Sequence, residues 1–507
     1  MDIKKMTLEE KVGQMLMFAF HGTSYNEQLE YQIKNLHVGG IIHFARNIDP
    51  NSENVIKLNN EIKKNSKYPI FIGTDQEGGM VVRVTNDITP FPGAMTLSAS
   101  QENISNICFY EGVGLKELGF NIVFAPVADV NNNPYNPVIS SRSYSDDPLN
   151  VSKHINEAVA GFNKANILST LKHFPGHGDT SVDSHLSMPS VNKSLEELEK
   201  IELYPFGKSI ENGCEGIMAA HILYNQLDSK YPSTLSEKII KKILREKMGF
   251  KGLVITDSLT MGAINANFTH REIVKNCVNA GVDIMMFCGK ADLEDQKHIY
   301  ETFLDLVNSG EIKEETVDEA VERIIRLKEK YVLKDAPKID KVKAYEESIK
   351  LFEKGVTLVE NKMDVTIKEN EKVLVIFPEV KLSTLVDNET SEYRTIKTYL
   401  ENVDEIIINQ NLENFDLLVQ KAEKYDKIIM ATLNVKADDY QVKVFNALDK
   451  EKVVVVSLRS PYDNMHLNGL ENYICLYEVT KWSLMSLAKC LQGKVEFQGK
   501  LPIKLVR

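Results

Sequence analysis

The chain has 507 residues, of which 43% are hydrophobic and 26% are charged, so it can bury sizeable cores and is long enough for two or three domains. Its formal net charge is −12 and it has no long basic block, which argues against DNA or RNA as a partner. No apolar run is long enough to cross a bilayer, so we expect no membrane partner.

The start of the chain and its cysteines favour a cytoplasmic location. The segment MDIKKMTLEEKVGQML has acidic residues in a helical pattern, and it lacks the apolar core and cleavage site of a signal peptide. The six cysteines are scattered, without a CxxC pair, and we predict that they are reduced and mostly buried thiols.

Eight short apolar runs alternate with amphipathic segments over the first 330 or so residues. The predicted strands are 14–20, 39–45, 69–75, 121–129, 167–173, 216–222, 252–258 and 283–288. Strands that alternate with helices form parallel sheets, and eight such units at this length fit a closed barrel with insertions. We therefore predict that residues 1–335 form a (β/α)8 TIM-type barrel, with an open doubly wound sheet as the alternative.

A second α/β pattern follows a charged segment. Residues 336–370 are predicted to be a charged helical connector. Beyond it, near-continuous apolar runs are typical of strands that are buried on both faces. They lie at 372–378, 405–411, 427–433, 452–458 and 473–478. Residues 371–507 are therefore predicted to be a smaller, doubly wound α/β sandwich domain.

Polar residues stand where the predicted barrel strands end, which is the face where barrels carry their reactive side chains. They are Asp75, Asp129, Lys172, His173, His221 and Asp257, with Arg83 and Arg142 in the loops that follow strands three and four. Each one alone is about equally well explained as a helix cap or a structural hydrogen bond. Asp257, for example, could cap a helix in DSLTMGAI. Their convergence on one face favours a functional site.

The loop KHFPGHGDTSVDSHLSMP, residues 172–189, is rich in histidine and aspartate. His173 and His177 have the spacing of a helical zinc pair, but Pro175 and Gly176 lie between them and prevent a shared helix face. No HExxH motif is present, so we expect no metal. A phosphate cradle is also disfavoured, because no helix obviously starts at Gly178.

Within this loop, Asp183 and His185 are two residues apart, so an extended backbone points both side chains to the same side. A carboxylate beside an imidazole orients the ring and favours its protonated form, as a proton donor near neutral pH requires. Spacing alone does not separate this reading from a solvated loop. Lys172 could likewise serve as a Schiff-base lysine at a strand end.

These segments carry a resemblance to a known family. KHFPGHGDTSVDSHLSMP, IGTDQEGGMVVRV and GLVITDSLTMGAI together resemble glycoside hydrolase family 3, and more closely its β-N-acetylglucosaminidases of peptidoglycan recycling. The similarity covers about residues 5–335, and the ending FQGKLPIKL is similar to the family's C-terminal sandwich domain.

The resemblance implies a role for each matching residue. Asp257 would be the nucleophile, His185 the general acid/base and Asp183 its partner. The residues that would bind the hydroxyls of N-acetylglucosamine (GlcNAc) are Asp75, Arg83, Arg142, Lys172 and His173. No cofactor is expected.

The expected activity is that of a retaining exo-β-N-acetylglucosaminidase. Its substrates would be cytosolic muropeptide fragments, in which GlcNAc is joined to N-acetylmuramic acid (MurNAc) or to 1,6-anhydro-MurNAc. Two alternatives stay within enzymes, a GlcNAc phosphorylase and a β-glucosidase. A non-catalytic sugar sensor is a third, which the intact Asp257, Asp183 and His185 disfavour.

The second domain shows no obvious catalytic residue, so we expect a scaffold or a homodimer surface. It contains the chain's single tryptophan, Trp482. Long polysaccharide clefts usually need several stacking aromatics, so a barrel without tryptophan favours a small exo-acting pocket, although tyrosine and phenylalanine could substitute.

Overall fold

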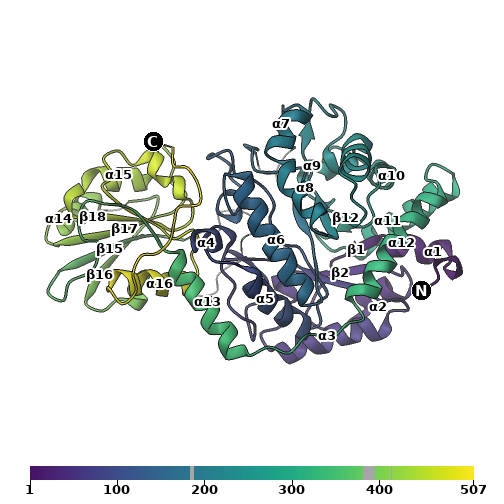
Figure 1. Cartoon of the computed structure of the whole chain (residues 1–507), viewed down its shortest axis with the longest axis horizontal. Coiled ribbons are helices and arrows are strands. Elements are labelled where there is room, and N and C mark those ends of the chain that lie inside the picture. Colours follow the sequence, from purple (N-terminus) through teal and green to yellow (C-terminus); the bar gives the residue numbers. More distant parts are fainter. Residues whose placement is uncertain (183–187, 381–386, 388–393, 413, 507) are drawn as a thin grey trace.

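The computed structural model describes residues 1–182, 188–380, 387, 394–412 and 414–506. The molecule is elongated, with a barrel lobe and a smaller sheet-containing lobe side by side (Figure 1). None of the helices in the described part of the chain combines the length and apolar character that a bilayer crossing needs. All six cysteines are free and buried, which confirms their predicted burial.

Eight parallel strands in chain order form the barrel. They are β1 (Leu16–Phe18), β2 (Gly40–His43), β3 (Phe71–Thr74), β6 (Ile122–Val123), β7 (Leu168–Ser169) with its continuation β8 (Leu171–Phe174), β10 (Gly216–Ala219), β12 (Leu253–Thr256) and β13 (Met285–Phe287). One sheet runs β13-β1-β2-β3-β6-β7 and another β12-β10-β8. A parallel bridge between Ile255 of β12 and Ile284, the residue before β13, joins the two sheets at their outer strands. All eight predicted strands are confirmed, and the open-sheet alternative is wrong.

Helices surround these strands, and most of them turn one apolar face towards the barrel. They are α2 (Glu27–Lys34), α3 (Ser52–Asn65), α5 (Ser105–Glu117), α6 (Pro148–Lys164), α8 (Leu203–Glu211), a π-type segment (Lys238–Lys247), α10 (His270–Ala280), α11 (Leu293–Asn308) and α12 (Glu314–Tyr331). Local signals set their ends. In α10, Thr269 and Glu272 form a capping box, and Gly281 ends the helix in the left-handed conformation that glycine adopts readily.

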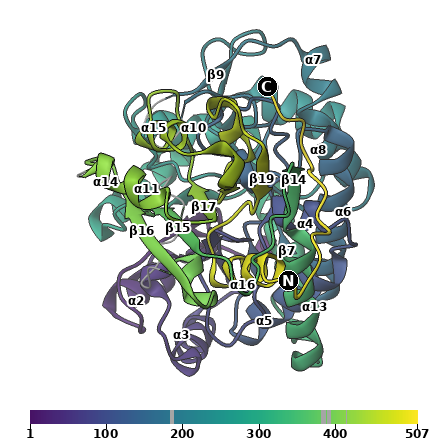
Figure 2. The ribbon, with the colours of Figure 1, turned by 90° about the vertical axis from the view of Figure 1, so that its left-hand side faces the viewer.

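The second lobe is a three-layer sandwich around a six-stranded sheet. Its strands are β14 (Thr357–Asn361), β15 (Val373–Pro378), β16 (Val403–Ile408), β17 (Lys427–Thr432), β18 (Val453–Ser457) and β19 (Asn472–Cys475), in the order β14-β19-β18-β17-β15-β16. All neighbours are parallel except β14 and β19. Figure 2 shows this sheet from its end of the molecule.

Residues that alternate along the strands belong to two separate hydrophobic cores, one on each face of that sheet. Leu374 packs with α14 (Phe415–Ala422) and α15 (Tyr440–Ala447), whereas Val375 packs with α16 (Lys481–Leu491). This arrangement confirms the predicted doubly wound sandwich.

The structure of the segment 336–370 differs in part from the predicted helical connector. It contains the helix α13 (Lys341–Gly355), as expected, but it also contains β14, the antiparallel edge strand of the second sheet. The helical prediction for 357–361 is therefore wrong. The reason is that an edge strand is only partly buried, so TLVEN lacks the continuous apolar run that marks a central strand.

The two lobes are tied together at several places. After α16 the chain returns to the barrel, where Lys500 N donates to Ala99 O at 2.9 Å and Lys504 N donates to Asp146 Oδ2 at 2.8 Å. Glu478, just beyond β19, accepts hydrogen bonds from Gly93 N at 2.8 Å and Thr96 Oγ1 at 2.6 Å. Since Gly93 and Thr96 belong to the start of α4 (Ala94–Ala99) on the barrel, Glu478 links the lobes.

Burial of Glu478 raises the pKa of its carboxyl from 4.5 to about 7. Between these pH values the folded state holds a proton that the unfolded state has released, so this group's contribution to stability falls as pH rises. Glu478→Gln resembles the protonated form and lacks this dependence. Its Tm should match the wild type near pH 5 and exceed it at pH 8, by an amount that corresponds to at most about 3 kcal/mol. Thermal denaturation at both pH values checks this; a Tm difference that is the same at both would contradict it.

Candidate active site

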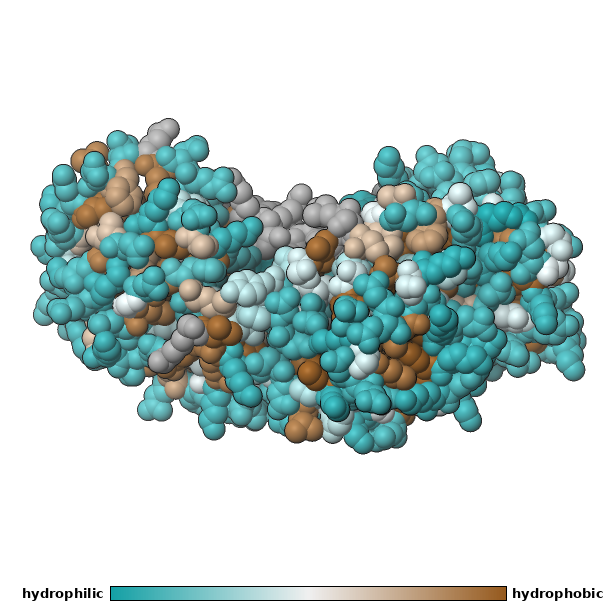
Figure 3. Space-filling view, turned by 90° about the horizontal axis from the view of Figure 1, so that it is seen from above, coloured by the Kyte–Doolittle hydropathy of each residue, from teal (hydrophilic) through white to brown (hydrophobic). Residues whose placement is uncertain are grey.

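A cavity of about 1500 Å³ lies at the carboxyl end of the barrel and is lined by both lobes. The lobes leave a hollow between them on the surface (Figure 3). The barrel side of the cavity includes Asp75, Arg83, Arg142, Lys172, His173 and Asp257, all of which the sequence predicted for one site. Asp183 and His185 are the two predicted site residues outside the described part of the chain. The structure brings the other six to one cavity, and the roles of all eight stay predictions.

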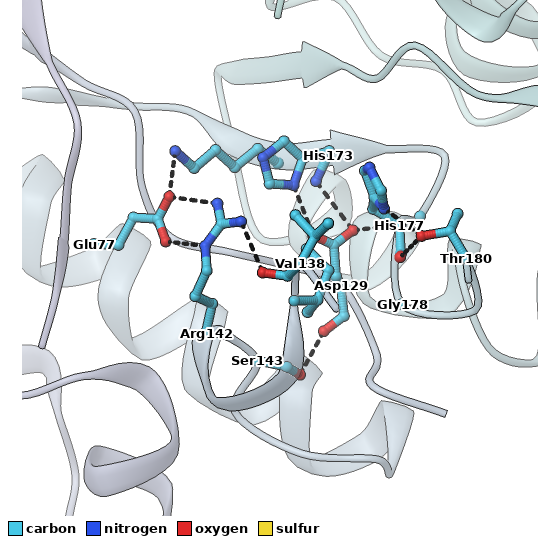
Figure 4. A network of polar contacts seen from close by, with 12 residues as sticks. Glu77, Asp129, Val138, Arg142, Ser143, His173, His177, Gly178 and Thr180 are labelled. Atoms are coloured by element: carbon cyan, nitrogen blue, oxygen red, sulfur yellow. Dashed lines mark hydrogen bonds and ion pairs between the residues drawn. The ribbon is translucent and has the colours of Figure 1, made fainter. Parts of the chain in front are cut away.

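Three cations and two carboxylates alternate along one side of this cavity. Lys172 Nζ lies 2.8 Å from Asp75 Oδ1 and 2.6 Å from Glu77 Oε1. Arg142 binds Glu77 with two nitrogens, Nε to Oε2 at 2.8 Å and Nη2 to Oε1 at 2.7 Å. Arg83 Nη2 lies 3.8 Å from Asp75 Oδ2. Figure 4 shows Glu77 facing Arg142 across this network.

Residues at or just beyond the carboxyl ends of three barrel strands meet in this cluster. Asp75 and Glu77 follow β3, Glu77 lying in the short strand β4 (Gln76–Gly78), while Lys172 lies in β8. Arg142 ends a turn of 3-10 helix, Ser140–Arg142, in the loop after β6. The carboxyl ends of parallel strands meet at one face, which brings these distant residues together.

Burial alone would raise the pKa of Glu77, but Arg142 and Lys172 outweigh it and hold the pKa well below its usual range. Burial alone would likewise lower the pKa of Lys172, but Asp75 and Glu77 raise it above the ordinary value. The lysine is therefore held as an ammonium ion. A protonated amine is not a nucleophile, so this geometry disfavours the Schiff-base alternative.

Asp129 orients the two histidines of the loop that begins at Lys172. Its Oδ2 lies 2.7 Å from His173 Nδ1, and its Oδ1 accepts from the backbone N–H of His177 at 2.6 Å. Figure 4 shows both histidines beside this carboxylate. Because the carboxylate accepts, His173 donates its Nδ1 hydrogen to Asp129, which fixes the orientation of the ring.

His177, the second histidine of the pair considered for a metal, is bonded within its own loop. Its Nδ1 lies 2.7 Å from Thr180 Oγ1, and burial lowers its pKa to about 4, so the ring is neutral at physiological pH. The two rings pack edge to face, with centroids 5.8 Å apart. Within the residues that the structure describes, no three histidine, cysteine, aspartate or glutamate side chains gather as metal ligands.

Asp257 follows β12 and is half-buried in the cavity wall. Its Oδ1 accepts from the backbone N–H of Ser258 at 2.7 Å. The nearest helix, α9 (Gly262–Asn265), begins five residues later and has Met261 at its N-cap, so the helix-capping alternative for Asp257 is wrong. Buried His221 lies behind this turn, with Nε2 2.9 Å from Ser258 O, so its place is structural.

Sequence reasoning assigned no site role to Glu77, Asp129 or Trp482. A signal for Glu77 was available, because it stands two residues after Asp75 and an extended backbone points both to the same side. Asp129 was noticed at a strand end, but its role as the carboxylate that holds His173 depends on the fold. Trp482 had no such signal, and only the structure shows that it lines the cavity.

Residues 7–327 match the family model described as the N-terminal domain of glycosyl hydrolase family 3. The chain belongs to glycoside hydrolase family 3. It is therefore a glycoside hydrolase, and the barrel and sandwich are the fold of that family. The resemblance of the three sequence segments to this family is thus confirmed.

Named relatives agree with this membership over different parts of the chain. "Beta-hexosaminidase A" of Pseudoalteromonas piscicida is 28% identical over 98% of this chain and 97% of its own length. "Beta-hexosaminidase" of Neisseria meningitidis serogroup B is 36% identical over 51% of this chain and 73% of its own. A solved family 3 beta-N-acetylglucosaminidase from Paenibacillus sp. str. FPU-7 is 32% identical, covers 99% of both chains and superposes with a TM-score of 0.90.

Glu77→Gln tests the role of the cluster. The change leaves two buried cations with one carboxylate fewer, and breaking a buried ion pair on one side costs about 3–5 kcal/mol of stability. Displacement of Lys172 and Arg142 should also lower kcat/KM by about 100-fold. Thermal denaturation and initial rates on a nitrophenyl β-GlcNAc measure the two effects.

The matched control is Glu102→Gln, since Glu102 pairs with Lys354 near the surface and both side chains are partly exposed. Its stability should change by less than about 0.5 kcal/mol, with unchanged activity. Equal effects of the two substitutions would show that Glu77 has no special place in the site.

Proposed function

We propose that this enzyme is a retaining exo-β-N-acetylglucosaminidase that releases terminal GlcNAc from cytoplasmic peptidoglycan fragments, GlcNAc–MurNAc or GlcNAc–anhydro-MurNAc. Family membership and the names of its relatives support β-N-acetylhexosaminidase activity. The observation that carries the proposal is that Asp257 lines the same cavity as the cluster of Asp75, Lys172 and Arg83. A reactive carboxylate thus lies in one cavity with several groups that can hold a sugar.

The terminal sugar would be held by the charged cluster. The Asp75 side chain is 19% exposed and that of Glu77 only 4%, so Asp75 faces the substrate while Glu77 holds the cations. Lys172 and Arg83 would donate hydrogen bonds to the sugar, and His173, held by Asp129 through Nδ1, would bind it through Nε2. Several charged groups on one sugar fix its position for attack at the anomeric carbon.

In the proposed reaction a carboxylate oxygen of Asp257 attacks the anomeric carbon. The glycosidic bond breaks as His185 gives a proton to the leaving oxygen, and a covalent glycosyl–Asp257 forms with inversion. His185, now neutral, then takes a proton from water, whose oxygen displaces Asp257 with a second inversion. Asp183 would orient the imidazole. A neutral base would not repel the carboxylate of a muramic acid residue.

The first experiment is incubation with GlcNAc–MurNAc, with and without phosphate, followed by mass analysis and NMR of the first-formed product. We expect free GlcNAc in the β configuration in both cases, because two inversions retain the configuration. First-formed α-GlcNAc would contradict a nucleophilic Asp257. GlcNAc 1-phosphate as the main product would show the phosphorylase alternative, and an uncleaved disaccharide would refute the proposed substrate.

The acid role of His185 can be tested with two leaving groups. A sugar alkoxide needs protonation to leave, whereas a nitrophenolate does not, and general acid help is worth about 10²–10⁴-fold. His185→Ala should lower kcat/KM on GlcNAc–MurNAc by about that factor, and much less on nitrophenyl β-GlcNAc. Asp183→Ala should act similarly but more mildly.

Asp257→Ala is the reference variant, and it should abolish activity on both substrates, since no leaving group replaces a missing nucleophile. The comparison uses kcat/KM or single turnovers, because His185 also acts as the base in the second step. Equal losses on the two substrates for His185→Ala would mean that this residue only supports its loop.

A further inference from the structure

The cavity extends beyond the charged cluster onto the second lobe. At about 1500 Å³ it is larger than the usual range of about 300–1000 Å³ for small-molecule sites. Its lining also includes Tyr345 of α13, the helix that leads from the barrel to the second sheet, and Thr480, Lys481 and Trp482 at the start of α16. A second sugar ring, the one that departs on cleavage, needs a surface next to the site for the first.

Tyr345 and Trp482 form an aromatic pair within this wall. Their ring centroids are 5.5 Å apart and the rings meet edge to face at 83°. Tyr345 is 43% exposed and Trp482 is partly buried, so part of each aromatic side chain is open to solvent. Aromatic rings offer flat apolar surfaces, which suit the C–H face of a pyranose.

Lys481 adds a positive charge beside this pair. Its side chain lines the cavity, and its Nζ lies 4.7 Å from the centroid of the Trp482 ring. A carboxylate on a sugar that rests against these rings would lie within reach of the ammonium group. The same wall therefore combines an apolar surface with a partner for an anion.

The wall is held firmly against the barrel side of the site. Glu478, four residues before Trp482, accepts from Gly93 N and Thr96 Oγ1. An added Cβ at Gly79 would lie 3.4 Å from the Glu478 carboxyl carbon, so this link lies beside the loop that carries Asp75 and Glu77. Val479 N also donates to Met80 Sδ at 3.3 Å. The Thr480 side chain caps α16, which fixes the first turn that holds Trp482.

We propose that the second lobe forms the subsite for the leaving sugar, in which Tyr345 and Trp482 hold the pyranose ring and Lys481 pairs with its carboxylate. This inference rests on the proposed function for the identity of the terminal sugar. It gives the second lobe a part in substrate selection, where the sequence predicted only a scaffold or a dimer surface.

Trp482 is the chain's single tryptophan, so intrinsic tryptophan fluorescence reports on this subsite alone. The titration uses Asp257→Asn, which should bind substrates without cleaving them, and calorimetry to establish saturation. Chitobiose (GlcNAc–GlcNAc) and GlcNAc–MurNAc should change the emission, and GlcNAc alone should not. Saturation with either disaccharide without any change in emission would overturn the proposal.

Kinetics on substrates with and without a second ring provide the second test. Trp482→Ala should lower kcat/KM on chitobiose and on GlcNAc–MurNAc by about 10- to 30-fold, the size expected for losing an aromatic anchor. Methyl β-GlcNAc, which has no second ring, should be affected by less than about twofold, and Trp482→Phe should recover part of the loss. Equal losses on all three substrates, or none, would overturn the proposal.

Charge recognition is tested separately with Lys481→Gln. It should lower kcat/KM about tenfold on GlcNAc–MurNAc but not on chitobiose, which has no carboxylate. Equal effects on the two disaccharides would show that Lys481 does not bind the carboxylate of the leaving sugar. The matched control is Val342→Ala, since Val342 lies on α13 like Tyr345, is 70% exposed and is not among the residues that line the cavity.

These experiments distinguish a failure of the proposed subsite from a failure of the proposed function. If the wild-type enzyme cleaves chitobiose but not GlcNAc–MurNAc, the proposed natural substrate is wrong, while the effect of Trp482→Ala on chitobiose still decides the subsite. If the wild type cleaves neither disaccharide, the fluorescence titration still shows whether a disaccharide reaches Trp482.

Discussion

The carboxylate of Glu77, buried between Arg142 and Lys172, is the interaction on which the rest of the site depends. Buried charges are tolerated only when partners compensate for the water they lose, and here each group has such a partner. Because Glu77 lies just beyond β3, Arg142 in the loop after β6 and Lys172 in β8, their pairing fixes three separate segments relative to one another. Asp75 and His173 can then face the cavity from a fixed frame.

The same cluster explains how so many charges coexist at one end of the barrel. Lys172 and Arg142 would repel each other without Glu77, and Glu77 could not stay ionised when buried without them. The alternation of charge thus keeps donors and acceptors in their ionised forms inside a partly enclosed site. Such groups bind hydroxyls more strongly than neutral ones do.

The second lobe meets the barrel at the carboxyl ends of its own parallel strands. Parallel sheets place their binding loops at that edge, as barrels do. The segment after β19 carries Glu478, which is bonded to the barrel, and then the residues at the start of α16 that line the cavity. The domain arrangement therefore turns two loop-bearing faces towards one space.

Much of this molecule follows from local sequence patterns. Apolar runs of four to eight residues, separated by amphipathic helices, are enough to place the eight barrel strands, because burial on both faces requires that composition. The strand β14 escaped this reasoning because an edge strand is half exposed and has no such pattern. Strand-end residues such as Asp75, Lys172 and Asp257 were equally predictable, since parallel strands bring their carboxyl ends to one face.

The sequence by itself determined which residues stand at the barrel's carboxyl face, because chain direction and strand ends are local properties. Only the tertiary structure decided how they pair. That Glu77 joins Arg142 to Lys172, and that Asp129 holds His173, depends on the relative rotation and height of neighbouring strands. The place of Trp482 depends on still more distant contacts, since Glu478 and Gly93 are separated by 385 positions. Contacts between such distant positions leave no periodic trace in the chain.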